Sequence, residues 1–178
     1  MSFPVAHGLL GATVVAALTP DLSPKRDWGK LLLGAAVACL PDLDYFVLIK
    51  LFHLRQSWHR GPTHSITFAL IVGALAALFV QGSYLRDAFT FWAAAASHGI
   101  LDLFNRYDPV EILWPVTRAR YAFDVRPYYN YPRMRAEPAP LELASLAKVC
   151  LLEAAVFVPV FLLVVVIKLR ASRHRIVH

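Results

Sequence analysis

Long apolar runs broken by single polar residues dominate the chain, and they predict helices of membrane length. The clearest run is residues 144–167, ASLAKVCLLEAAVFVPVFLLVVVI, which precedes a basic tail at residues 168–178. About 22 helical residues rise about 33 Å, enough to cross a hydrocarbon core of about 30 Å. Pro159 lies inside this run, and it predicts a kink because lipid offers the backbone no alternative to a helix.

Four further runs predict helices that accompany this one. Residues 65–81 and 88–104 each read as a span, the second one shorter and broken by polar residues near its end. Residues 31–52 are long enough to span but carry two aspartates and a proline in the middle, whereas residues 5–18 suit a tilted or half-inserted helix. The pattern predicts an all-α, polytopic membrane bundle of four to five transmembrane helices, forming one domain over residues 1–178.

The connections between these runs are short, with the exception of residues 105–143. This segment is rich in Arg, Tyr and Pro, and PYYNYP at residues 127–132 predicts irregular structure. Tyrosine at this density is typical of a membrane–water interface. We expect an interfacial loop that lies on the bilayer, and the alternative is a loop that also covers a site.

Composition and charge agree with a membrane location. Residues of the hydrophobic set make up 58% of the chain and charged residues 17%, whereas charged residues are about 25% of a soluble domain. These values exclude a disordered chain, a collagen and a disulfide scaffold. The net charge of +6 favours anionic lipid headgroups as the partner, and we expect no nucleic acid.

The arrangement of basic residues predicts an orientation. If every run crosses the membrane, the two faces receive equal numbers of Lys and Arg, but short loops and the acid-free tail weigh more than the long loop. We therefore expect the C-terminus in the cytoplasm. Because an odd number of crossings separates them, the tail and the polar residues described next should lie on opposite sides.

Seven ionisable side chains lie in or beside the apolar runs, where such groups are costly and indicate function. In the topology above they can converge on one cavity that opens to one side of the membrane. Carboxylates mixed with imidazoles favour Zn, Mn or Fe over Ca or Mg. The candidate metal ligands are His7, Asp42, Asp44, His59, His64, His98 and Asp102.

Spacing relates four of these residues. His98 and Asp102 are four residues apart, so both project from one helix face, and they either hold a metal together or form a pair in which the Asp orients the His. Asp42 and Asp44 diverge on an ideal helix, so Pro41 would have to open the backbone for both to point inward. The alternative is that Asp42 caps a restarted helix while Asp44 pairs with an arginine.

The motif HRGPTHS at residues 59–65 leads directly into an apolar run. We expect Thr63 to cap the following helix, whose first amides form an anion site. His64 would lie at the mouth of this helix, and Arg60 could bind a phosphate with its two-pronged guanidinium.

Together these motifs resemble a known family. His7, PDLD at 41–44, HRGPTHS at 59–65 and HGILD at 98–102, followed by WPVTRAR at 114–120, are similar to the YdjM-like, LexA-binding inner-membrane proteins, described as membrane-associated metal-dependent hydrolases. The resemblance covers roughly residues 3–121. That family is distantly similar to zinc-dependent phospholipase C and the S1/P1 nucleases, which are all-helical enzymes with clusters of metal ions held by His and Asp.

The resemblance implies a ligand set. His7, one of Asp42 and Asp44, and one of His59 and His64 match ligands on successive helices, while His98 and Asp102 match an HxxxD motif whose Asp can bridge two metals. The soluble enzymes add later ligands, but after Asp102 this chain has His only at positions 174 and 178. One or two ions are therefore expected in place of three, with Zn as the first choice and Mn or Fe as alternatives.

The leading hypothesis for function is a membrane-embedded metal-dependent hydrolase that acts on a phosphoester, or an ester, of a lipid or other amphiphile. Asp42 or Asp44 would act as the base, and Arg60, Arg118 and Arg120 would bind the anionic substrate. The alternative is a non-catalytic partner-binding or regulatory membrane protein with a structural His/Asp metal site. A transporter is less well supported because the sequence has no inverted repeat.

Overall fold

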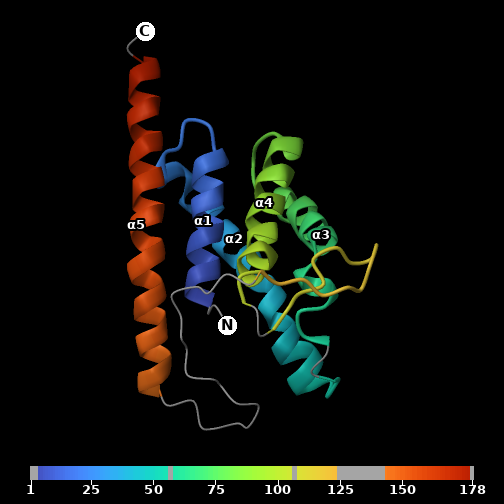
Figure 1. Ribbon diagram of the computed structural model, residues 1–178. Coiled ribbons are helices and arrows are strands. Elements are labelled where there is room, and N and C mark those ends of the chain that lie inside the picture. The colour runs from blue at the N-terminus through green and yellow to red at the C-terminus, as the bar shows by residue number, and fades with distance from the viewer. Residues whose placement is uncertain (1–3, 56–57, 106–107, 124–142, 177–178) are drawn as a thin grey trace.

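The computed structural model (Figure 1) describes residues 4–55, 58–105, 108–123 and 143–176. Most of the expected interfacial loop, residues 124–142 with the tyrosine-rich stretch at 127–132, lies outside the described residues. The described chain contains no strand, only one antiparallel bridge between Val110 and Tyr121. The all-α prediction is confirmed by five α-helices: α1 (Pro4–Leu18), α2 (Pro24–Cys39), α3 (Ile66–Ala76), α4 (Tyr84–Asp102) and α5 (Leu143–Ile176).

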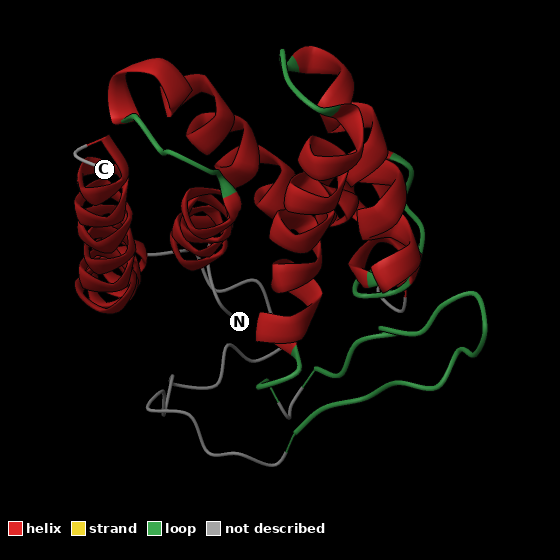
Figure 2. Cartoon of the chain, turned by 90° about the horizontal axis from the view of Figure 1, so that it is seen from above, coloured by secondary structure: helices red, strands yellow, loops and turns green. Residues whose placement is uncertain are grey.

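The helices alternate in direction, so that each connects the two ends of the bundle (Figure 1). Helix α4 packs against α1, α2 and α3, whereas α5 stands at the side of the molecule and packs against α1 (Figures 1 and 2). Helix α4 ends, and α5 begins, at the same end of the bundle, and the C-terminus lies at the other end (Figure 1).

Small residues allow the helices to pack closely. A Cβ added to Gly11 would lie 2.5 Å from the carbonyl oxygen of Gly34, so only glycine lets α1 and α2 approach so closely. Close packing through small side chains is typical of helices in membranes, where lipid gives no hydrophobic driving force. The core they enclose consists of Val15, Val37, Ala69, Val72, Ala76, Ala77, Phe91, Ala94, Ala95 and Ala96.

Two helical segments have the length and apolar character of a membrane span. They are Pro24–Leu51 with 28 residues and Ala147–Ser172 with 26 residues. Helix α1 has 15 residues and α3 has 11, fewer than the roughly 20 that cross a bilayer. The run at residues 65–81 thus forms a shorter helix than expected, and a count of four to five transmembrane helices stays a prediction.

The backbone opens at Pro41, as the sequence analysis required. A short 3-10 turn, η1 (Leu40–Asp42), follows α2, and a π-helical segment, η2 (Tyr45–Leu51), comes after it. Proline has no N–H to donate and its ring disturbs a regular helix, while π-helical turns occur often at functional sites. The irregular winding lets two aspartates that are two residues apart face one group of histidines.

Candidate metal centre

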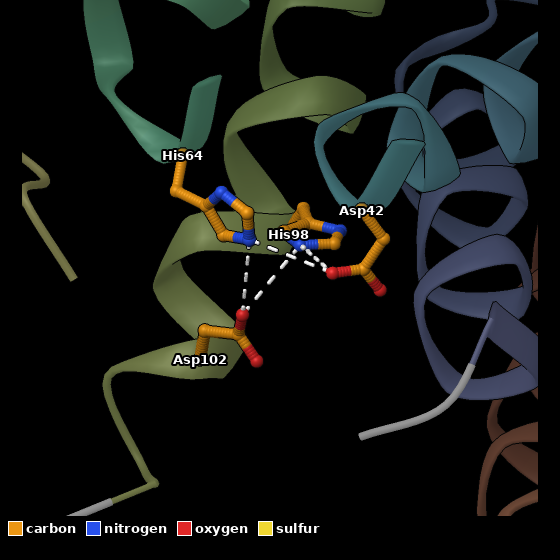
Figure 3. Close-up of side chains that lie close together, drawn as sticks. All are labelled: Asp42, His64, His98 and Asp102. Carbon is orange, nitrogen blue, oxygen red and sulfur yellow. Dashed lines mark ion pairs between the residues drawn. The ribbon is translucent and has the colours of Figure 1, made fainter. Parts of the chain in front are cut away.

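Four side chains from three segments, η1, η4 (Pro62–His64) and α4, point toward one another (Figure 3). The imidazole Nε2 of His64 lies 3.5 Å from Oδ1 of Asp42 and 3.5 Å from Oδ2 of Asp102. Nε2 of His98 lies at the same two distances from the same oxygens. A tetrahedral ion with bonds of about 2.0–2.2 Å has ligand atoms about 3.3–3.6 Å apart. Four of the six distances among these donor atoms thus fall in that range, and all four atoms lie within 4.8 Å of one another. We call these four residues the His/Asp cluster, and their donor atoms are close enough to surround one ion.

The burial of the cluster adds to this argument. The side chains of His64, His98 and Asp102 are fully buried, whereas that of Asp42 is 24% exposed. Nε2 of both histidines has no hydrogen-bond partner among the residues that the structure describes. Buried polar atoms are almost always satisfied, so these two nitrogens fit a bound cation. The residues present could therefore hold a metal ion.

Outer contacts orient the two imidazoles for this role. Nδ1 of His98 lies 2.7 Å from the carbonyl oxygen of Ala38, so Nδ1 donates the hydrogen, and in the neutral ring Nε2 is then the nitrogen that can bind a metal. Burial lowers the pKa of His64, against an opposing contribution from Asp42. The neutral imidazole is the form that binds a metal.

Asp44 and His59 lie in a second layer around the cluster. Asp44 accepts a hydrogen bond from Nδ1 of His59 at 2.7 Å and another from the Thr63 hydroxyl. Its Oδ2 also lies 3.6 Å from Nδ1 of His64. The donor atoms of Asp44, His59 and His64 are close enough to form a ligand group of their own, but these contacts already use both oxygens of Asp44. The geometry suits Asp44 to orienting the two imidazoles.

His7 joins the cluster from α1. Its ring stacks on that of His98, with centroids 3.7 Å apart, and its Nε2 lies 3.7 Å from Oδ1 of Asp102. Both ring nitrogens are buried and have no hydrogen-bond partner in the described part of the chain. The neighbouring N–H of Ala6 donates to Oε2 of Glu153 on α5 at 3.1 Å. The last helix thereby supports the position of the first histidine.

Arg60 is buried against the cluster with only 1% of its surface exposed. Its Nη2 lies 3.3 Å from Oδ1 of Asp102, its Nε lies 3.1 Å from Oδ2 of Asp108, and its Nη1 donates to the Asp108 carbonyl at 2.7 Å. Its φ of 61° is a left-handed conformation that costs energy in any residue except glycine. Arg60 thus binds two aspartates, where the sequence analysis expected it to reach a substrate phosphate.

All seven ligand candidates of the sequence analysis come together in the fold. The expected cap at Thr63 is wrong, because a 3-10 turn, η4 (Pro62–His64), precedes the helix and Ser65 accepts the hydrogen bond from Phe68 N. Thr63 binds Asp44 in its place. Arg118 and Arg120, expected at the substrate, line a separate pocket.

The sequence analysis missed three contributors to the site. Asp108 forms an ion pair with Arg60, and Glu153 accepts a hydrogen bond from the Ala6 N–H of α1. The carbonyl of Ala38 accepts a hydrogen bond from His98 and so orients its ring. Glu153 has a signal in the sequence, because a carboxylate within an apolar run needs a partner. Asp108 is one of five acidic residues in the segment 105–143, and nothing in the sequence distinguishes it from the others. A backbone carbonyl such as that of Ala38 leaves no trace in the sequence pattern.

Gly99 provides a test of the geometry that changes no ligand. A Cβ at this position would lie 2.4 Å from the His64 carbonyl oxygen and 2.7 Å from Cδ1 of Ile112. Gly99→Ala should therefore displace His64 and reduce bound metal several-fold, at a cost of roughly 1–3 kcal/mol in stability. The measurement is metal per protein by mass spectrometry after purification in detergent.

Gly29→Ala is the matched control, because nothing lies within 4 Å of a Cβ there. Full metal content in Gly99→Ala would show that the position of His64 does not matter for metal binding.

Comparison with known proteins identifies the family of the chain. The model of the YdjM inner membrane protein family matches residues 1–173. The match includes the five helices through most of α5, beyond the part that carries the sequence motifs. No curated protein matches the chain, and neither does any solved structure.

Proposed function

The chain belongs to the YdjM inner membrane protein family, and from this premise we propose that it is a membrane-embedded metal-dependent hydrolase. Its substrate would be a phosphoester, or an ester, of a lipid or other amphiphile. The observation that carries the proposal is the His/Asp cluster, in which four donor atoms have the spacing of a metal shell and Asp42 alone of the four is partly exposed.

The charge of the site supports a dication. Asp42, Asp44 and Asp102 bring three carboxylates together with one buried guanidinium, that of Arg60. With neutral imidazoles, these three carboxylates and the one guanidinium leave two negative charges, even before Asp108, a 38% exposed partner of the same guanidinium, is counted. Leaving such charges unbalanced at this depth is costly. The mixture of nitrogen and oxygen donors favours Zn, with Mn or Fe as alternatives. When bound, such an ion supplies Lewis acidity and an activated water at neutral pH.

Asp42 and Arg60 would have different roles in the proposed hydrolysis. Asp42 is the better base, because it is partly exposed whereas both oxygens of Asp44 already accept hydrogen bonds. A carboxylate within reach of the attacking water can take its proton. Arg60 acts as a positioning residue, since it holds Asp102 and the loop at Asp108 in place.

The surroundings of Asp42 suit an amphiphilic substrate. Leu43 is 50% exposed and Phe46 is 63% exposed, and both follow Asp42 in a segment of membrane length. If the polar head of an amphiphilic substrate were bound at Asp42, its acyl chains would lie beside Leu43 and Phe46 in the surrounding lipid. An entirely soluble substrate would gain nothing from this apolar surface.

The same arrangement supports a topology in the inner membrane. The C-terminus and the end of α4 that carries Asp102 lie at opposite ends of the bundle (Figure 1). With the basic tail in the cytoplasm, as the distribution of Lys and Arg favours, the His/Asp cluster would open towards the outer face of a multi-pass protein.

One observation favours a second candidate. Four protein donors around one ion would close a tetrahedral shell, which is the usual form of a structural site. In that case the chain would be a non-catalytic partner-binding or regulatory membrane protein. The two candidates differ in whether Asp42 stays bound to the ion or leaves a position open.

Replacing Asp42 separates the candidates. For an enzyme, Asp42→Asn should keep most of the metal and lower hydrolysis of a fluorogenic amphiphilic phosphodiester by about 10²–10⁴-fold. In the cobalt-substituted protein, added phosphate should change the visible absorption spectrum, because an open position accepts it. Asp21→Asn, at an exposed carboxylate near the other end of α1, is the control. A cobalt spectrum that ignores phosphate, with no hydrolysis by the wild type, would support the structural candidate.

A further inference from the structure

A cationic pocket lies beside the metal centre. It has a volume of about 290 Å³ and is lined by Arg55, Trp58, Pro62, Glu111, Arg118 and Arg120. We propose that this pocket is a second site, which binds a phosphoryl-bearing anion: the phosphate of a lipid headgroup or free phosphate.

The charges that line the pocket match a phosphate dianion. Glu111 pairs with Arg120 at 3.3 Å. Arg55 and Arg118 are exposed, and no described carboxylate lies within ion-pair distance of either. Within the described part of the chain, two guanidinium groups that line the pocket thus have no carboxylate partner. A guanidinium can bind two phosphate oxygens at once, and this makes arginine the preferred residue for phosphate recognition.

The pocket also has the character of a membrane interface. Trp58 is 44% exposed at its wall, and Leu54 and Phe52, which shortly precede Arg55 in the chain, are 40% and 62% exposed. Tryptophan prefers the level of the lipid headgroups, where one part of the ring is apolar and the N–H stays hydrated. A lipid phosphate between the arginines, with its chains beside these apolar residues, satisfies both parts of the surface.

The pocket adjoins the metal centre without sharing its ligands. Pro62 lines the pocket and opens the turn that holds His64. Arg120 donates to the His59 carbonyl at 3.4 Å, and the N–H of Glu111 donates to the Arg60 carbonyl at 3.0 Å. None of the seven metal-ligand candidates lines this pocket. Anion binding here goes beyond the proposed hydrolysis and should occur without a metal.

Calorimetric titration of the full chain in maltoside micelles tests the proposal. The probes are dioctanoyl phosphatidic acid, inorganic phosphate and, as the phosphate-free lipid, dioctanoylglycerol. The double variant Arg55→Gln/Arg118→Gln should bind phosphatidic acid at least about tenfold more weakly than the wild type. The matched double variant is Arg26→Gln/Arg86→Gln, which removes the same charge at side chains 64% and 48% exposed at the other end of the bundle, and it should stay within about twofold.

The outcomes are distinct. Saturable binding of phosphatidic acid alone would identify a lipid headgroup, and equally strong binding of inorganic phosphate would identify free phosphate. Absence of saturable binding by both, equal binding of dioctanoylglycerol, or an equal loss in the matched variant would overturn the proposal. His98→Ala should bind the anion as the wild type does, so a failure of the proposed hydrolase leaves this result unchanged. Loss of anion binding in folded His98→Ala would contradict a separate site.

Discussion

His98→Ala should purify from the membrane without bound transition metal. The substitution removes a donor atom that lies 3.5 Å from oxygens of both Asp42 and Asp102. His64 and the carboxylates of Asp42 and Asp102 would remain, and these three donors would bind an ion more weakly than the four together. Loss of an outer partner of a ligand already costs about 10–100-fold in metal affinity, and we expect loss of the ligand itself to cost more.

Metal analysis after dialysis against a weak chelator measures this effect. His53→Ala is the matched control, because His53 is an exposed histidine that belongs to neither group of possible metal ligands. Thr63→Val should give an intermediate result, since it removes only the hydroxyl that binds Asp44. Wild-type metal content in His98→Ala would rule out the His/Asp cluster as the metal site, whatever the activity of the protein.

Arg60→Ala should destabilise the protein by roughly 3–5 kcal/mol, the usual cost of removing one partner of a buried ion pair. Asp102 is fully buried, and the Arg60 guanidinium lies 3.3 Å from it. Without Arg60, the buried carboxylate of Asp102 would lose one of the positive charges that stabilise it. Chemical denaturation in detergent tests this prediction, and added metal should reduce the loss of stability because a dication also compensates the charge of Asp102.

Two further variants identify the cause. Arg60→Gly removes the same guanidinium but suits the φ of 61°, so it should be less destabilising than Arg60→Ala by about 1–2 kcal/mol. Arg26→Ala breaks an arginine–aspartate pair whose arginine is 64% exposed, and it should cost less than about 1 kcal/mol. Equal losses in Arg60→Ala and Arg26→Ala would mean that burial of the pair contributes nothing.

The sequence predicts the parts of the site that depend on local geometry. His98 and Asp102 share a helix face because they are four residues apart, and the structure brings them to one cluster. The five apolar runs likewise predict the five helices, because apolar length and helix formation are coupled in lipid. The polar residues within those runs identify the site, since their burial needs a reason.

The sequence could not predict which partner each polar group takes. Asp44 binds His59 and Thr63, and no described arginine forms an ion pair with it. These partners follow from the path of the backbone after Pro41, which depends on a 3-10 turn and a π-helical segment. Arg60 is buried and its backbone adopts a left-handed conformation, which sequence patterns rarely reveal outside glycine. The partner of each polar side chain depends on how the separate helices are positioned along one another when they pack.

The bond between Glu153 and the start of α1 has a consequence for how the protein is made. A helix leaves its first N–H groups without partners inside the helix, and here the Ala6 N–H, beside His7, finds its acceptor 147 residues later in the chain. Synthesis proceeds from the N-terminus, so α1 leaves the ribosome long before Glu153 does. The surroundings of His7 are therefore completed late, when the last helix docks against the first, and a nascent chain that stalls before α5 leaves the His/Asp cluster without this support.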